Sequence, residues 1–175
     1  MTTTFADLGL SDTILKALEK TQLKMPSPIQ VQAIPHIMAG KDLMGLAQTG
    51  TGKTAAFGLP LLHRILDLGH PPGPKHVRAL ILAPTRELAK QIAEEAQILF
   101  AGSVLRTAVA YGKSAISVQV AALKSGVDLL VATPGRLLDH FRMPYAKLEH
   151  LEYLVLDEAD RMLDMGFLPE IKKVL

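Results

Sequence analysis

Residues 42–68 read DLMGLAQTGTGKTAAFGLPLLHRILDL, and this segment indicates the fold class of the chain. The stretch opens with a short apolar run, Asp42–Ala47, that is typical of a buried strand. A glycine-rich turn follows and leads into a segment of helical period, Lys53–Leu68. Strand, glycine-rich loop and helix in this order match the P-loop pattern, with Ala47 where the strictest form has glycine. The sequence therefore predicts an α/β fold with a phosphate-binding loop.

The rest of the chain repeats this alternation of short apolar runs and longer helical segments, which is typical of a parallel sheet with crossover helices. The predicted strands are Asp42–Ala47, Val77–Ala83, Leu105–Tyr111, Asp128–Ala132 and Tyr153–Leu156. The predicted helices are Ser11–Lys20, Lys53–Leu68, Arg86–Phe100, Ser114–Lys124, Pro134–Phe141 and Leu168–Val174. We expect an open, mostly parallel sheet with helices on both faces, and ligands at the carboxyl ends of the strands.

Composition excludes several classes of protein. The 175 residues include no cysteine, which removes disulfides, thiolate metal sites and cysteine nucleophiles, and fits a reducing compartment. No stretch approaches the roughly 18 apolar residues of a membrane span, and the N-terminus has no basic or apolar run of a secretory signal. A cytoplasmic location without membrane association is predicted. The net charge of +2 neither requires nor excludes a nucleic acid.

The glycine-rich turn has the residue types that phosphate binding requires. Gly50 and Gly52 allow the backbone to curl so that successive N–H groups point at phosphate oxygens. The helix that begins near Lys53 adds the positive end of its dipole. Lys53 is expected to reach the β- and γ-phosphates, and the Thr54 hydroxyl to bind Mg²⁺.

Two carboxylates follow the last predicted strand. Asp157 is the expected second Mg²⁺ ligand, because this hard cation prefers carboxylate and water oxygens. Glu158 can orient and deprotonate a water that attacks the γ-phosphate. An acidic helix N-terminus explains the same two residues without catalysis. Because the chain also contains a P-loop, a role in nucleotide hydrolysis is favoured over a role in helix capping.

Four segments together resemble the DEAD-box RNA helicases: AQTGTGKT (Ala47–Thr54), PTRELA (Pro84–Ala89), TPGRL (Thr133–Leu137) and DEAD (Asp157–Asp160). Their order and approximate spacing match that family, and Met25–Gln30 (MPSPIQ) resembles its adenine-recognition motif. The resemblance implies the RecA-like, ATP-binding N-terminal lobe of such a helicase, of bacterial type. It implies ATP and Mg²⁺ as ligands, with Lys53, Asp157 and Glu158 as catalytic residues and Thr54 and Asp157 at the metal. The implied ATP-binding residues are Phe5, Lys24, Gln30, Gln48, Thr49, Gly50, Thr51, Gly52, Lys53 and Thr54.

Gln30 supplies a physical reason for a preference for ATP. Adenine places an N6 donor beside an N7 acceptor, and the two ends of a glutamine amide pair with both, whereas guanine offers two acceptors there. By resemblance Phe5 occupies the position of the family's upstream aromatic residue. Phe5 either stacks on the base or anchors the N-terminal segment in the core. Gln22 stands where the adenine motif usually begins with glycine.

The resemblance also implies an RNA-binding face with backbone contacts and little sequence specificity. The implied RNA-binding residues are Pro84, Thr85, Arg86, Gly112, Thr133, Pro134, Gly135 and Arg136. Arginines, hydroxyls and helix N-termini all suit phosphate contacts. Both motifs also have a purely structural alternative: PTRELA is a capped helix start, and TPGR is a strand-to-helix turn. Tyr111 replaces the first of two glycines that the family usually carries.

Taken together, the sequence predicts an N-terminal segment, residues 1–30, and a RecA-like lobe, residues 31–175, that ends before the family's Ser-Ala-Thr motif. The resemblance implies a second lobe that supplies arginines to the transferring phosphoryl group, and a complete protein that unwinds RNA duplexes locally or remodels RNA–protein complexes. We expect the fragment to bind nucleotide without unwinding. Two alternatives remain: an RNA-binding module that uses nucleotide only as a structural ligand, and a P-loop ATPase of another kind.

Overall fold

The computed structural model describes residues 2–47, 52–69, 71–101, 103, 105–112, 115–144 and 146–174. These residues form two compact units: a helical unit of residues 1–70 and 95–103, and a sheet unit of residues 71–94 and 104–175. Helix α4 (Arg86–Phe100) contributes residues to both. The predicted phosphate-binding residues Gln48, Thr49, Gly50 and Thr51 lie outside the described residues.

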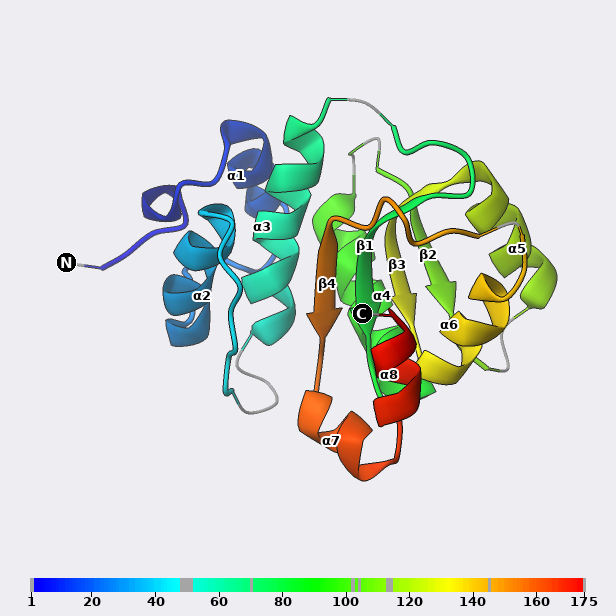
Figure 1. Ribbon diagram of the computed structural model, residues 1–175. Coiled ribbons are helices and arrows are strands. Elements are labelled where there is room, and N and C mark those ends of the chain that lie inside the picture. Colours follow the sequence, from blue (N-terminus) through cyan, green and yellow to red (C-terminus); the bar gives the residue numbers. More distant parts are fainter. Residues whose placement is uncertain are drawn as a thin grey trace. The chain divides into compact units, whose positions relative to one another are not determined.

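The helical unit contains the short 3-10 helix η1 (Ala6–Leu8) and the helices α1 (Asp12–Glu19), α2 (Pro28–Met38) and α3 (Lys53–Asp67) (Figure 1). Helices α2 and α3 pack against each other, and α1 also contacts α3. Their shared core contains fully buried aliphatic side chains, namely Ile14, Ile34, Leu59 and Ile65. Burying each such side chain contributes about 1.5–3 kcal/mol, so this core favours the packing of the three helices against one another.

Helix α2 is absent from the predicted helices, because Pro26 and Pro28 indicate a rigid loop. In the structure Ser27 is the N-cap and Pro28 occupies the first turn, where a proline lacks only an N–H that the helix does not use. The Oε1 atom of Gln30 accepts a hydrogen bond from Ser27 N at 2.9 Å. This is the reach-back bond of a capping box, whose Ser-x-x-Gln spacing is visible in the sequence.

The prediction of a strand at Asp42–Ala47 is wrong for the described structure, where this segment has no regular secondary structure. Its side chains are open to solvent, with Met44 89% and Leu46 91% exposed. A strand is stable only when a neighbouring strand pairs with its N–H and C=O groups. The described residues of the helical unit form helices and turns and offer no such ladder to this segment.

The sheet unit is built on four described strands, β1 (Val77–Leu82), β2 (Thr107–Ala110), β3 (Val127–Ala132) and β4 (Tyr153–Leu156). Their order is β2-β3-β1-β4, and all three pairings are parallel. The two central strands, β1 and β3, are buried along their whole length. The predicted parallel α/β sheet is confirmed for these strands.

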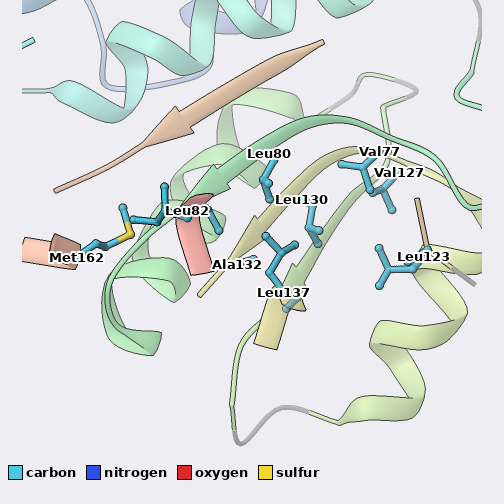
Figure 2. Packing of buried hydrophobic residues seen from close by; sticks show 12 residues of the cluster. Val77, Leu80, Leu82, Leu123, Val127, Leu130, Ala132, Leu137 and Met162 are labelled. Carbon is cyan, nitrogen blue, oxygen red and sulfur yellow. The ribbon is translucent and has the colours of Figure 1, made fainter. Parts of the chain in front are cut away.

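Helices α5 (Ile116–Ser125), α6 (Pro134–Phe141), α7 (Ala159–Asp164) and α8 (Leu168–Val174) complete the sheet unit. Of these, α7 is absent from the predicted helices. Figure 2 shows how Leu123 of α5, Leu137 of α6 and Met162 of α7 meet strand side chains such as Leu80 and Leu130 in one core. Every residue of β1 and β3 is buried, so neither face of these central strands is open to solvent, as a parallel sheet requires.

Gly126 is a position in the sheet unit that requires glycine. It joins α5 to β3 with a φ of +86°, and a Cβ there would collide with the backbone oxygen of Gly73. Gly126→Ala is expected to lower the free energy of unfolding by about 2–4 kcal/mol, because the left-handed backbone and the collision both act. Urea denaturation followed by circular dichroism measures this loss.

Gly166→Ala is the matched control, since Gly166 has a φ of +84° and a Cβ added there would meet nothing within 4 Å. The backbone cost alone, about 1–2 kcal/mol, is expected there. Equal losses at the two positions would contradict the collision at Gly126.

Candidate functional site

The carboxyl ends of the four described strands lie in one row across the sheet. Leu82 pairs with Ala132 and with Leu156, and Ala110 pairs with Ala132. Three backbone hydrogen bonds extend the row: Ala83 N to Ala132 O at 3.0 Å, Thr133 N to Ala110 O at 3.0 Å and Asp157 N to Leu82 O at 2.9 Å. The structure thus brings the starts of the segments after β1, β2, β3 and β4 to one edge of the sheet. These segments are Pro84–Arg86, Tyr111–Gly112, Thr133–Arg136 and Asp157–Glu158.

After β1, Thr85 begins helix α4. Its Oγ1 atom accepts a hydrogen bond from Leu88 N at 3.2 Å, so the capped helix start expected as the structural alternative is present. Arg86 forms an ion pair with Glu87 at 3.4 Å, and its side chain is 39% exposed. An exposed ion pair of this kind is weak, at about 0–1 kcal/mol, so Arg86 can exchange Glu87 for a phosphate at little cost.

After β3, Pro134 occupies the first turn of α6, and Thr133 caps it without a side-chain capping bond. Gly135 is exposed, and a Cβ at this position would meet nothing within 4 Å. The Nη1 atom of Arg136 is buried and has no hydrogen-bond partner among the described residues. A buried guanidinium N–H without an acceptor costs free energy, so a movement of the Arg136 side chain that reaches an anion at this edge would be favourable.

After β2, the backbone at Tyr111–Gly112 is held by Gln119, a residue that no motif in the sequence singles out. The Nε2 atom of Gln119 donates a hydrogen bond to Tyr111 O at 3.2 Å. The Oε1 atom of Gln119 lies 2.6 Å from Nε2 of His140. Burial lowers the pKa of His140, the positive charge of Arg136 lowers it further, and Asp139 opposes the shift. The buried imidazole is therefore neutral near pH 7.

After β4, Asp157 is 8% exposed, and Glu158 precedes helix α7. Glu158 has a φ of +51°, a left-handed conformation that costs an L-residue about 1–2 kcal/mol. Its Oε2 atom lies 3.3 Å from Nη1 of Arg161. The strained backbone at the second carboxylate is typical of functional positions, whereas an acidic helix cap needs no such strain.

The predicted adenine residue, Gln30, lies against the described end of the P-loop in the helical unit. Gly52 is the N-cap of α3 in a left-handed conformation, and its carbonyl oxygen accepts a hydrogen bond from Gln30 Nε2 at 3.1 Å. A Cβ at Gly52 would lie 2.5 Å from Gln30 Nε2. Gln30 is 1% exposed, while Lys53 and Thr54 on the first turn of α3 are half-buried.

Phe5 and Lys24 line the same cavity in the helical unit, which has a volume of about 200 Å³. Phe5 is 5% exposed, so its ring anchors the N-terminal segment, and base stacking by Phe5 stays a prediction. Lys24 Nζ donates a hydrogen bond to the carbonyl oxygen of Glu19 at 3.1 Å.

The two predicted metal ligands fit Mg²⁺ by their chemistry, because a threonine hydroxyl and a carboxylate are the hard oxygen donors that this ion prefers. Thr54 belongs to the helical unit and Asp157 to the sheet unit. Among the residues that the structure describes, no cluster of three or more histidine, aspartate or glutamate side chains is arranged to hold a metal ion. None of the helices in the described ranges is long and apolar enough to cross a membrane.

Comparison with known proteins identifies the family. The family model described as DEAD/DEAH box helicase matches residues 27–175. The chain is 47% identical over 171 residues to the ATP-dependent RNA helicase CshA of Limosilactobacillus reuteri, covering 98% of this chain and 33% of the relative. It is 46% identical over 173 residues to the ATP-dependent RNA helicase DeaD of Haemophilus influenzae, covering 98% of this chain and 27% of the relative.

The chain thus spans about a third of the length of the curated relatives it matches. A crystal structure of a DEAD box protein from the hyperthermophile Methanococcus jannaschii has the same fold, with a TM-score of 0.86 and 39% identity. That match covers 98% of this chain and 46% of the other. The RecA-like fold expected from the sequence is confirmed, and the chain belongs to the DEAD/DEAH box helicase family.

Proposed function

We propose that this chain is the ATP-binding lobe of a cytoplasmic ATP-dependent RNA helicase, in which ATP binding and hydrolysis drive local unwinding of RNA duplexes or remodelling of RNA–protein complexes. The observation that carries the proposal is the row of strand ends at Leu82, Ala110, Ala132 and Leu156. This row gathers a DEAD motif and three segments suited to phosphate contacts at one edge of a parallel sheet, where such folds bind their ligands.

Nucleotide binding is assigned to the start of α3 and to Gln30. Lys53 and the backbone after Gly52 would hold the phosphates, and Thr54 with Asp157 would hold Mg²⁺, which when bound neutralises phosphate charge. Gln30 uses one hydrogen-bonding position on each amide atom, for Ser27 N and for Gly52 O. One lone pair on Oε1 and one N–H on Nε2 remain for the adenine edge. Because Gln30 is 1% exposed, base binding there requires a local opening.

In the proposed hydrolysis, Glu158 would take a proton from the water that attacks the γ-phosphate, and Asp157 would help to hold Mg²⁺. The second lobe expected from the resemblance would supply the positive charge that stabilises the transferring phosphoryl group. Pro84–Arg86, Gly112 and Thr133–Arg136 would bind the RNA backbone. Since backbone contacts carry no base information, we expect RNA of many sequences to bind.

The proposal is tested by calorimetric titration of this chain with Mg-ADP and then Mg-GDP. The mismatch between guanine and Gln30 corresponds to roughly 1–3 kcal/mol, so ADP is expected to bind about 5–150-fold more tightly. Gln30→Ala is expected to remove the preference, and Lys53→Ala to weaken both nucleotides.

Equal affinity of the unaltered chain for ADP and GDP would contradict the assignment of Gln30. In a longer chain that includes the second lobe, Glu158→Gln is expected to retain nucleotide binding and to lose RNA-stimulated hydrolysis. Unchanged hydrolysis in that variant would contradict the assignment of Glu158 as the base.

A further inference from the structure

Two polar side chains lie buried between α5, α6 and the loop after β2. Gln119 and His140 are each 2% exposed, although glutamine usually lies at the surface and histidine is intermediate in burial. On the same helix as Gln119, Ile116 and Val118 are 57% and 67% exposed. Helix α5 thus buries its glutamine and exposes two aliphatic residues. A buried amide needs hydrogen-bond partners to offset its desolvation, and Gln119 has them.

The hydrogen bonds of Gln119 determine which atoms of Gln119, Tyr111 and His140 are donors and which are acceptors. Tyr111 O is only an acceptor, so the Gln119 atom that faces it at 3.2 Å must be the Nε2 donor. The Oε1 acceptor then faces His140, whose Nε2 atom lies 2.6 Å away and must carry the proton. A rotated amide would place two acceptors against each other at Tyr111. The arrangement therefore has one direction, from His140 through Gln119 to the Tyr111 carbonyl.

This chain of hydrogen bonds connects two of the segments at the edge of the sheet. Tyr111 follows β2 directly, and its neighbour Gly112 has open space where a Cβ would stand. His140 lies on α6 four residues after Arg136, on the same side of the helix. Burial and Arg136 both lower the pKa of His140, which keeps the imidazole neutral near pH 7, with its proton on the Nε2 atom that faces Gln119.

We propose that Gln119 and His140 are positioning residues of the nucleic-acid edge: they hold the Tyr111–Gly112 backbone against α6, so that this loop and Thr133–Arg136 present one rigid surface to an RNA backbone. The part of this proposal that concerns RNA binding rests on the proposed function, whereas the hydrogen bonds that hold the loop do not depend on it. Rigidity matters here because a loop that is ordered before binding loses less conformational entropy when RNA binds. It also gives Gly112 a defined place although Tyr111 replaces the family's usual glycine.

The test compares four variants of this chain: Gln119→Leu, His140→Leu, His140→Gln and Val118→Ala. Gln119→Leu removes both hydrogen bonds with little change in volume, and His140→Gln retains a donor near the position of Nε2. Amide hydrogen exchange at Gly112, measured by NMR, reports the order of the loop. Fluorescence anisotropy with a labelled ten-nucleotide oligouridine reports RNA affinity. Calorimetry with Mg-ADP reports whether the nucleotide site is affected.

Gln119→Leu and His140→Leu are expected to raise exchange at Gly112 by about 3–10-fold and to weaken oligouridine binding by a similar factor, as the loss of a net hydrogen bond predicts. ADP affinity should stay within twofold. His140→Gln should recover most of both losses. Val118→Ala, at an exposed position of the same helix, should change neither quantity. Melting curves identify a variant that fails to fold. If one of the two leucine variants does not fold, the other is used for the comparison.

Exchange at Gly112 within twofold of the unaltered chain in both leucine variants would overturn the proposal, whatever happens to RNA binding. Faster exchange at Gly112 with unchanged oligouridine affinity would contradict the claim that the ordered loop contributes to RNA binding. If the unaltered chain does not bind oligouridine and exchange still rises in the variants, the proposed RNA-binding function fails, and the holding of the loop by Gln119 and His140 is supported on its own.

Discussion

Asp128→Ala is expected to lower the free energy of unfolding of the sheet unit by about 3–5 kcal/mol, because it removes a buried carboxylate that faces a buried guanidinium. Arg78 in β1 and Asp128 in β3 are 5% and 2% exposed, and their Nη1 and Oδ1 atoms lie 3.8 Å apart. The carboxylate has a second role, since its Oδ2 atom accepts a hydrogen bond from Arg106 N at 2.9 Å. The substitution removes both interactions.

Urea denaturation of four chains separates the two roles of Asp128. Asp128→Asn keeps an acceptor for Arg106 N and removes the charge, so it is expected to be destabilised less than Asp128→Ala. Arg78→Met leaves a buried carboxylate and is also expected to be destabilised. The double variant Arg78→Met, Asp128→Asn is expected to be more stable than the sum of the two single losses predicts, because no buried charge remains. A cost below about 1 kcal/mol for Asp128→Ala would show that the pair does not act as a buried ion pair.

Gly52→Ala is expected to weaken Mg-ADP binding by about 100-fold. The φ of Gly52 is +84°, and a Cβ would lie 2.5 Å from Gln30 Nε2 and 3.1 Å from Ser27 Oγ. The left-handed backbone costs alanine about 1–2 kcal/mol, and the displaced Gln30 loses its bond to the Gly52 carbonyl, about 1 kcal/mol more. If the variant relaxes this cap when nucleotide is absent, binding must restore it, and a total of about 2–3 kcal/mol corresponds to a factor of about 30–150 in Kd.

Gly45→Ala is the control for this experiment, because a Cβ at Gly45 meets only Ile29 Cδ1 at 3.9 Å, an ordinary contact. Calorimetry should give this variant the ADP affinity of the unaltered chain. If Gly52→Ala also retained that affinity within threefold, the cap of α3 would not belong to the nucleotide site.

Elements whose boundaries depend on neighbouring residues are predicted closely. Helix α6 has the predicted bounds, Pro134–Phe141, because a proline at the first turn starts a helix by itself. Helix α4 also matches its prediction, Arg86–Phe100, since Thr85 supplies its cap. The missed helix α2 has a local signal as well, the Ser27-x-x-Gln30 capping box, but the prolines around it favour a loop.

The segment Asp42–Ala47 shows where a local pattern is insufficient. Its apolar run is typical of a strand, yet the described structure leaves Met44 and Leu46 exposed and unpaired with any strand. A helix satisfies its own backbone within a few residues, whereas a strand depends on a partner distant in the sequence. Because strands pair with partners that are distant in the sequence, the alignment of the four strand ends could not be derived from the sequence. It required the register of β1, β2, β3 and β4.

The P-loop and DEAD motifs, the α/β class and the family are recognisable before folding is considered, because each motif consists of particular residue types at short spacings. The pairs of polar residues that are buried together became visible in the folded structure: Arg78 with Asp128, Gln30 with Gly52, and His140 with Gln119 and Tyr111. In each case the partners are separated by eight or more positions in the chain, and no periodicity marks them. The reason is physical. A polar side chain is stable in the interior only where the fold supplies a complementary group, and that group is chosen by packing.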